Sequence, residues 1–223
     1  MSLTRAELAA LIDHTLLRAG STAAQFEALC EEARTHGFAT VCVPPTRIRH
    51  ALICLEGLVR ICTVIGFPLG ASVPAVKASE ACLAIADGAD ELDVVIALGA
   101  LKDGDRDAVL RDLMTVVAVA EGRPVKAILE TALLTPEEID LACAIAVDAG
   151  AAFVKTSTGF GPPGGATPEI VARMRRAVGP RIGVKASGGI TDALTAKAML
   201  AAGADRLGTS ASLAILDGWD ALQ

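Results

Sequence analysis

Two lysines in matching surroundings are the residues of this sequence best suited to chemistry. Lys155 ends an apolar run and is followed at once by hydroxyl-bearing residues and a glycine, in the segment 153–159 (FVKTSTG). Lys185 repeats the arrangement in the segment 181–189 (RIGVKASGG). Apolar residues that lead to a charge and then to small polar residues indicate a buried strand that delivers one amine to a loop. The pair predicts one lysine as a nucleophile and the other as the group that tunes it.

The two lysines are expected to act together because a solitary lysine is a weak nucleophile near neutral pH, where almost all of it is protonated. A second ammonium nearby, together with an apolar wall, would lower the pKa of the attacking amine and free it to add to a carbonyl carbon. A single lysine at a strand end would more often pair with a carboxylate or a substrate phosphate. Two lysines at matched positions favour chemistry.

A carboxylate, Asp93, lies inside the apolar segment 91–96 (ELDVVI). A buried carboxylate is costly unless a cation or several hydrogen-bond donors meet it. Asp93 could therefore partner either reactive lysine and relay protons through a water molecule. It could almost equally form only a core ion pair with Lys126 on the neighbouring strand.

Several other polar residues are expected to support this site or the core. Lys126 and Glu130 are predicted to share one strand face and to complete a polar network. Asp13 and His14 are expected to be polar core residues with satisfied hydrogen bonds rather than catalysts. Cys42 is expected to pack in the core rather than to act as a nucleophile.

Glycine-bearing loops after the last three expected strands indicate a phosphate site. Glycine lets backbone N–H groups approach an anion, and the helix expected to start near Thr191 presents its positive end there. Any one of these loops could be only a tight turn, but their joint placement beside the lysines favours a phosphorylated substrate. The residues predicted to bind it are Thr158, Gly159, Ser187, Gly188, Gly189, Gly208, Thr209 and Ser210.

The composition excludes several other classes of function. The chain has 223 residues, 52% of them hydrophobic, and a formal net charge of −6, so it can bury a large core and lacks the basic patch of a nucleic-acid-binding protein. Its apolar runs are too short for a bilayer and its N-terminus has no signal-peptide pattern, so we expect a cytoplasmic protein without a membrane partner. Six cysteines without a CxxC pair and three scattered histidines predict no metal site.

Strand candidates alternate with helices along the whole chain. The strands are expected at residues 11–15, 38–43, 59–67, 91–96, 125–131 and 205–209, with two more that end near Lys155 and Lys185. Helices are expected at about 22–35, 47–55, 72–88, 109–119, 135–150 and 191–203, with another from residue 167.

This alternation, with strands that are largely apolar on both faces, predicts a parallel α/β fold. A doubly wound, dinucleotide-binding sheet is expected to have a GxGxxG turn after its first strand, and this sequence has none at that position. We therefore expect residues 1–223 to form a single (β/α)8 barrel domain. Active sites of such barrels lie at the carboxyl ends of the strands, where Lys155 and Lys185 are expected.

The sequence resembles the deoxyribose-phosphate aldolase family, whose members are Schiff-base aldolases. The resemblance covers nearly the whole chain, and its most specific part is the pair of motifs KTSTG at 155–159 and KASGG at 185–189. Further matching segments lie at 11–15, 41–43, 91–95, 126–131, 184–190 and 208–210.

The resemblance implies a (β/α)8 barrel in which Lys155 forms the Schiff base, Lys185 perturbs it and Asp93 relays protons. It implies reversible cleavage of 2-deoxy-D-ribose 5-phosphate to D-glyceraldehyde 3-phosphate and acetaldehyde, in deoxyribose phosphate catabolism. Neither a metal nor an organic cofactor is expected. Barrels of this size often form dimers, so a homodimer is an open expectation.

The chain departs from the family pattern in two ways. Many relatives have an arginine where this chain has Thr191, and some end in a mobile tail with a tyrosine, whereas this chain has no tyrosine. The phosphate would then be held more by backbone N–H groups, and proton transfer would rely on Asp93 and water. Two rivals stay open: a Schiff-base aldolase with another donor, such as dihydroxyacetone phosphate or pyruvate, and a non-aldolase barrel that binds phosphosugars.

Overall fold

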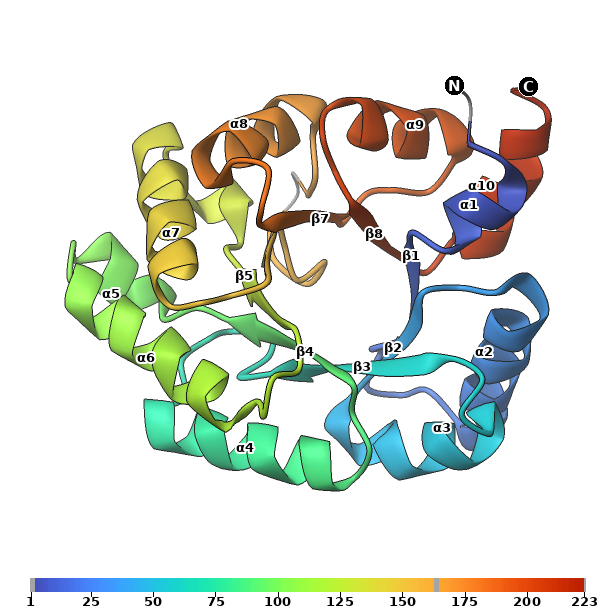
Figure 1. The fold of residues 1–223 in the computed structure, drawn as a ribbon, viewed down its shortest axis with the longest axis horizontal. Helices are drawn as coiled ribbons and strands as arrows, with labels where there is room; N and C mark the ends of the chain where they lie inside the picture. Colours follow the sequence, from blue (N-terminus) through green and yellow to red (C-terminus); the bar gives the residue numbers. More distant parts are fainter. Residues whose placement is uncertain (1–2, 163–164, 223) are drawn as a thin grey trace.

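The structure, a computed structural model, describes residues 3–162 and 165–222. Within these residues, eight parallel strands close into a barrel in which each strand pairs with the next and the last pairs with the first (Figure 1). The strands are β1 (Ile12–Thr15), β2 (Thr40–Val43), β3 (Arg60–Ile65), β4 (Glu91–Val95), β5 (Val125–Ile128), β6 (Phe153–Lys155), β7 (Gly183–Ser187) and β8 (Arg206–Thr209). The predicted (β/α)8 barrel is confirmed.

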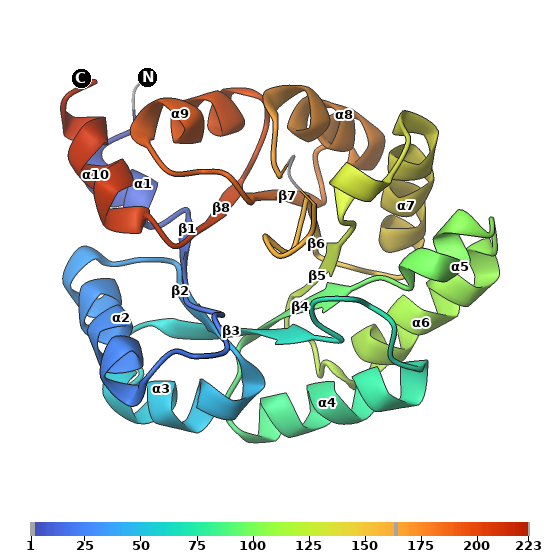
Figure 2. The same cartoon turned by 180° about the vertical axis from the view of Figure 1, so that it is seen from behind.

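Helices form a ring around the barrel, as Figures 1 and 2 show from its two ends. They are α1 (Arg5–Ala9), α2 (Ala23–His36), α3 (Ile48–Leu55), α4 (Pro74–Ala86), α5 (Leu98–Lys102), α6 (Arg106–Val119), α7 (Pro136–Asp148), α8 (Pro168–Val178), α9 (Ala193–Ala201) and α10 (Ser212–Asp220), with short 3-10 turns η1 (Pro45–Arg47) and η2 (Thr131–Leu133). In the part of the chain that the structure describes, no helix combines the length and the apolar character needed to cross a bilayer.

Local sequence signals set the starts and ends of several helices. The Thr135 hydroxyl accepts a hydrogen bond from the Glu138 N–H, and the Glu138 carboxylate accepts one from the Thr135 N–H, which is a complete capping box at the start of α7. Asp192 caps α9 through the Thr195 N–H. Gly37 ends α2 in the left-handed conformation, with φ of 69°. These boundaries agree with the expectations from sequence.

Three helices, α1, α5 and α10, lie outside the ranges predicted from sequence. α1 and α10 lie side by side (Figures 1 and 2), and the Trp219 indole N–H donates to the Leu3 carbonyl at 2.8 Å. Arg5 of α1 pairs with Asp217 and Asp220 of α10. These contacts join segments more than two hundred residues apart, so no local pattern could reveal them.

The predicted strand at 125–131 is shorter in the structure, and this changes the position of Glu130. β5 ends at Ile128, and Glu130 has a left-handed backbone with φ of 52°. A left-handed residue interrupts the two-residue alternation of a strand. The prediction that Glu130 shares one strand face with Lys126 is therefore wrong.

Strand alternation separates an apolar layer from a charged barrel interior. On β7, Val184 and Ala186 are fully buried in the apolar core between barrel and helices. Lys185, between them, faces the opposite side and is also fully buried. Because residues of a strand alternate between its two faces, the ionisable side chains gather inside the barrel. The fold thus brings charges from several strands into one enclosed space.

Candidate active site

Lys155 and Lys185 are paired residues on the adjacent strands β6 and β7. Their Nζ atoms lie 2.8 and 2.7 Å from the same oxygen, Oδ2 of Asp93. Asp93 and Lys185 are fully buried, while Lys155 keeps 3% of its surface exposed. The structure therefore brings together the three residues predicted to be catalytic.

The other oxygen of Asp93 meets Lys126. Lys126 Nζ lies 2.7 Å from Asp93 Oδ1 and 2.7 Å from Glu91 Oε2. The two roles considered for Asp93, partner of the reactive lysines and core ion pair with Lys126, are thus both present, one on each oxygen. The carboxylate of Asp93 is thus shared between Lys126 of β5 and the lysines of β6 and β7.

Asp13 closes the network on the side of β1. It forms an ion pair with Lys185 through Oδ2, and its Oδ1 accepts a hydrogen bond from Arg206 Nη1 at 2.5 Å. Arg206 also lies 3.4 Å from Glu91 Oε2. Asp13 is fully buried, and among the described residues its Oδ2 has the ion pair with Lys185 but no hydrogen bond, so the expectation of satisfied hydrogen bonds is confirmed for Oδ1 and wrong for Oδ2. Its contact with Lys185 also places it next to the candidate catalytic group.

Sequence reasoning missed Glu91 and Arg206 as members of this network. Glu91 stands two residues before Asp93 on β4, so strand alternation alone would have placed both on the interior face. Arg206 meets Asp13 because β8 pairs with β1 when the barrel closes. Only the topology brings these two strands together, and no local signal indicates the contact.

The charges of the network set the ionisation of Asp93 and Lys185. Burial opposes ionisation of Asp93, but the ammonium groups of Lys126, Lys155 and Lys185 hold the pKa of its carboxyl well below the usual range. Burial likewise favours a neutral Lys185, but the carboxylates of Asp13 and Asp93 raise the pKa of Lys185 above its ordinary value. Asp93 is therefore an anion and Lys185 a cation at neutral pH.

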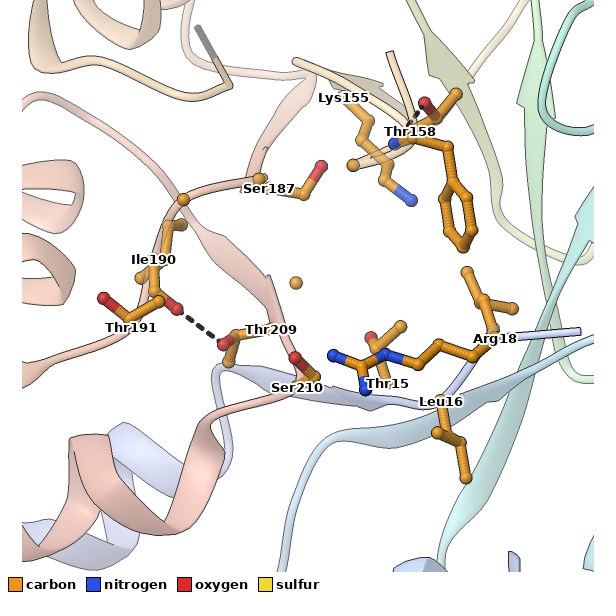
Figure 3. A pocket seen from close by; sticks show the side chains of 16 residues that line it. Thr15, Leu16, Arg18, Lys155, Thr158, Ser187, Ile190, Thr191, Thr209 and Ser210 are labelled. Atoms are coloured by element: carbon orange, nitrogen blue, oxygen red, sulfur yellow. Dashed lines mark hydrogen bonds between the residues drawn. The ribbon is translucent and has the colours of Figure 1, made fainter. Parts of the chain in front are cut away.

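Lys155 connects this network to a pocket of about 290 Å³ at the carboxyl ends of the strands. Figure 3 shows its Nζ pointing into the open centre, between the walls that carry Thr158, Ser187 and Ser210. All of the residues predicted to bind the phosphate, from Thr158 to Ser210, line this pocket. Leu16, Arg18 and Phe160 also line it, and they were not predicted.

The glycine loops present backbone N–H groups on one wall of the pocket. Gly188 and Gly189 both have left-handed backbones, with φ of 87° and 79°, which glycine adopts at little cost. The Thr209 hydroxyl donates to the Ile190 carbonyl at 2.7 Å and so joins the loops after β7 and β8. In residues 3–162 and 165–222, the N–H groups of Gly189 and Ser210 have no hydrogen-bond partner. They are free to bind an anion.

Glu130 supports the loop after β6 instead of the lysine network. Its carboxylate accepts hydrogen bonds from the hydroxyl of Thr158 and, at 3.3 Å, from the Thr158 N–H. The left-handed backbone at Glu130 turns the side chain from the β5 ladder toward this loop. Its role in the structure is thus to hold one wall of the pocket.

Cys42 and His14 lie in different parts of the fold, Cys42 inside the barrel and His14 outside the lysine network. Cys42 is fully buried inside the barrel, where it packs with Cys62 and Val64. The Cys62 thiol donates to Asp93 Oδ1 at 3.1 Å, and burial together with this carboxylate raises the pKa of Cys62 well above its usual value. His14 contacts Ser212 at 2.8 Å and Glu32 at 2.6 Å, outside the lysine network.

Among the residues that the structure describes, two groups of side chains come close enough to hold a metal ion, which spacing along the chain did not indicate. They are Cys42, Cys62 and Asp93, and Asp13, Cys62 and Glu91. Lys126 already supplies a cation to both groups: its Nζ lies 3.3 Å from Cys62 Sγ and 2.7 Å from both Asp93 and Glu91. A metal ion would have to displace this ammonium, so a metal-independent site remains our prediction.

Comparisons with known proteins agree with this geometry. A family model described as "DeoC/LacD family aldolase" matches residues 8–218. A deoxyribose-phosphate aldolase of Geobacillus sp. (strain WCH70) is 57% identical over 213 residues, 95% of this chain and 95% of that protein. A deoxyribose-phosphate aldolase of Methanothermobacter thermautotrophicus is 54% identical over 217 residues, 97% and 96% of the two chains. A solved structure, "Unique tetrameric structure of deoxyribose phosphate aldolase from Aeropyrum pernix", has a TM-score of 0.92 at 37% identity, over 99% of this chain and 94% of that one.

Proposed function

The chain belongs to the DeoC/LacD family of aldolases, and on this premise we propose that it is a Schiff-base aldolase that reversibly cleaves 2-deoxy-D-ribose 5-phosphate to D-glyceraldehyde 3-phosphate and acetaldehyde. The observation that carries the proposal is the position of Lys155. Its Nζ is 2.8 Å from the carboxylate of Asp93 and opens into a pocket lined by glycine loops. One end of the pocket offers an amine for an aldehyde and the other offers N–H groups for a phosphate.

Among the described residues, Lys155 forms fewer ion pairs with carboxylates than the other two lysines of the network, Lys126 and Lys185. Among the described residues its only carboxylate partner is Asp93, which stays paired with Lys126 and Lys185 when Lys155 becomes neutral. Lys185, by contrast, pairs with both Asp13 and Asp93. Breaking a buried ion pair is costly mainly because it leaves an uncompensated charge. A neutral Lys155 breaks one such pair, whereas a neutral Lys185 would break two, and this supports Lys155 as the nucleophile.

The reaction then follows from an amine beside a carboxylate. The neutral Lys155 amine adds to the C1 aldehyde of the open-chain sugar, and loss of water gives an iminium ion. Asp93, through a water molecule, accepts the proton of the C3 hydroxyl while the electron pair of the C2–C3 bond moves into the iminium. D-Glyceraldehyde 3-phosphate leaves, and Asp93, through the same water molecule, returns the proton to C2 of the enamine that remains on Lys155. Hydrolysis of the resulting iminium releases acetaldehyde and restores the amine.

Lys185 acts in this scheme through its charge. It is held beside Lys155 by the shared Asp93 oxygen, and its raised pKa keeps it cationic. A fixed positive charge next to Lys155 disfavours a second ammonium at that site and opposes reprotonation of the nucleophile. Proton transfer through Asp93 and water fits a chain that has no tyrosine.

The compartment, the domain organisation and the assembly belong to the same proposal. We expect the protein to work in the cytoplasm as one (β/α)8 domain, and its six free cysteines fit a reducing compartment. A homodimer is supported by the exposed apolar side chains of Leu52 and Ile53 on α3 and Leu83 on the neighbouring α4. Sedimentation velocity at several protein concentrations would test the dimer.

The proposed activity is tested by following product release with NMR. The protein is incubated with 2-deoxyribose 5-phosphate and, separately, with substrates that would release dihydroxyacetone phosphate or pyruvate. We expect acetaldehyde and glyceraldehyde 3-phosphate from the first and no cleavage of the others. Cleavage of the other substrates only would identify a different aldolase, and no cleavage at all would favour a binding protein.

A further inference from the structure

We propose that Arg18 is the charged side chain that recognises the substrate phosphate and makes the site prefer phosphorylated sugars. This inference rests on the proposed aldolase function and adds a specificity determinant to it. Arg18 lies between β1 and α2, across the pocket from the glycine loop after β7, and its guanidinium points toward Ser210 in the loop after β8 (Figure 3). The phosphate would then be held from two sides, by backbone N–H groups and by a guanidinium.

The charge on the pocket walls singles out Arg18. Among the described residues that line the pocket, Lys155 and Arg18 are the two with charged side chains. Lys155 must be neutral to attack a carbonyl carbon, so it cannot also neutralise a phosphate while it reacts. Thr191, on the glycine-loop wall, brings a hydroxyl and no charge. A phosphate group carries close to two negative charges at neutral pH, and Arg18 is the available counter-charge.

The guanidinium of Arg18 is uncommitted. Within residues 3–162 and 165–222, no ion pair or side-chain hydrogen bond involves it. Its backbone, however, is fixed, because the Arg18 carbonyl accepts a hydrogen bond from the Ser21 N–H at 3.1 Å. A fixed backbone with a free guanidinium can close on an anion without breaking an existing contact.

A neighbouring cavity of about 530 Å³ is also lined by Arg18, but the side chain is directed into the active pocket (Figure 3). Arg18 lines both cavities, but in Figure 3 its guanidinium extends into the active pocket, toward Ser210. The other arginine of the second cavity, Arg47, is already engaged, since it stacks over Phe26 with 5.0 Å to the ring centroid and donates to the Ser21 carbonyl at 3.4 Å. Arg47 therefore does not compete for the phosphate.

The hydrogen-bond donors of the Arg18 guanidinium match the acceptor oxygens of a phosphate group. A guanidinium offers parallel N–H donors that fit two phosphate oxygens at once, whereas a lysine offers a point charge. Arg18 is exposed at the pocket mouth, so salt screens its attraction for the phosphate. Its contribution to substrate affinity should therefore fall as ionic strength rises, whereas the contribution of the glycine N–H groups should change less.

The test compares Arg18→Gln with Arg18→Lys and with Arg111→Gln. Arg111 is an exposed arginine on the outer face of α6, so its variant removes the same charge far from the pocket. For cleavage of 2-deoxyribose 5-phosphate we expect Arg18→Gln to raise KM about five- to tenfold at low salt with little change in kcat. For unphosphorylated 2-deoxyribose we expect kcat/KM to stay within about twofold. Arg18→Lys should lie between Arg18→Gln and wild type, and Arg111→Gln should match wild type.

A second readout separates this inference from the proposed function. Binding of inorganic phosphate, followed by NMR titration, should weaken by about the same factor in Arg18→Gln and should not require cleavage. Equal phosphate binding by wild type and Arg18→Gln, or an equal loss of activity on both sugars, would overturn the role of Arg18. Phosphate binding that depends on Arg18 in a protein without cleavage activity would overturn the aldolase function and leave the role of Arg18 standing.

Discussion

Lys155 and Lys185 are separated by one carboxylate oxygen: the Nζ atoms of both lie within 2.8 Å of Asp93 Oδ2. The sequence predicted a pair of lysines in which one ammonium lowers the pKa of the other, with Asp93 as a possible partner of either. The structure places an anion between them that attracts both protons. The reactivity of Lys155 therefore depends on the balance of the whole network, in which the buried basic side chains of Lys126, Lys155, Lys185 and Arg206 face the carboxylates of Asp13, Glu91 and Asp93.

Replacing Lys185 with leucine should lower kcat for 2-deoxyribose 5-phosphate by at least about a hundredfold. The variant removes the fixed cation beside Lys155 and leaves Asp93 to Lys126 and Lys155, so Lys155 is held as an ammonium. Steady-state kinetics on the folded variant would measure this. Wild-type kcat in Lys185→Leu would refute the role assigned to Lys185.

A matched control is Lys77→Leu. Lys77 is also fully buried and ion-paired, with Nζ 2.6 Å from Asp112 Oδ2, but the pair joins α4 to α6 outside the barrel. Breaking this pair should cost about 3–5 kcal/mol of the free energy of unfolding. The kcat of the folded Lys77→Leu protein should match wild type, because its lysine does not contact the network. This control separates loss of a buried lysine from loss of the lysine beside the nucleophile.

Asp93→Asn should destabilise the fold in a manner that depends on pH. At pH 7 the variant leaves Lys126, Lys155 and Lys185 without their shared anion, which should cost about 3–5 kcal/mol. The folded pKa of Asp93 is well below its unfolded value of about 3.9. Its contribution to stability is therefore fully present above about pH 4 and is lost as pH falls through the folded pKa.

Urea unfolding of wild type and Asp93→Asn at a series of pH values would measure this dependence. The difference in the free energy of unfolding between wild type and Asp93→Asn should be constant from about pH 5 to pH 8 and should decrease below about pH 4. A gap that stays unchanged down to the acid limit of folding would show that ionised Asp93 does not stabilise the network.

Chelators should not affect the activity. The side chains that could hold a metal ion, including Cys62 and Asp93, already surround the ammonium of Lys126. The iminium nitrogen supplies the positive charge that stabilises the carbanion, so the chemistry does not require a metal. Assays before and after dialysis against EDTA would check this. Activity that is lost in EDTA and restored by zinc would contradict it.

The sequence predicted most of the fold because its signals are local. A few consecutive residues are enough to identify a strand or helix, the capping box at Thr135 or the helix-ending Gly37. The pair of lysine motifs likewise predicted which strands carry Lys155 and Lys185. α10 was missed because α1 holds it from the other end of the chain, through Arg5.

The candidate site was predictable only in part. Asp93 and Lys155 stand out because charge inside an apolar strand is unusual. Arg206 becomes a partner of Asp13 only when β8 closes on β1. The position of Glu130 was predicted wrongly because its own left-handed backbone, just after β5, directs its side chain to the Thr158 loop. Such contacts depend on closure of the barrel and on one backbone torsion, and neither is visible in residue spacing.

The central claim, that Lys155 is the nucleophile, is tested most directly by reductive trapping. The protein is treated with acetaldehyde and borohydride, and the modified residue is located by peptide mass mapping. We predict irreversible inactivation of the wild-type protein with one N-ethyl group on Lys155. In Lys155→Ala we predict no label at position 155 and no inactivation by acetaldehyde and borohydride. Labelling of Lys185 or Lys126 in place of Lys155, or no labelling in an enzyme that cleaves its substrate, would contradict it.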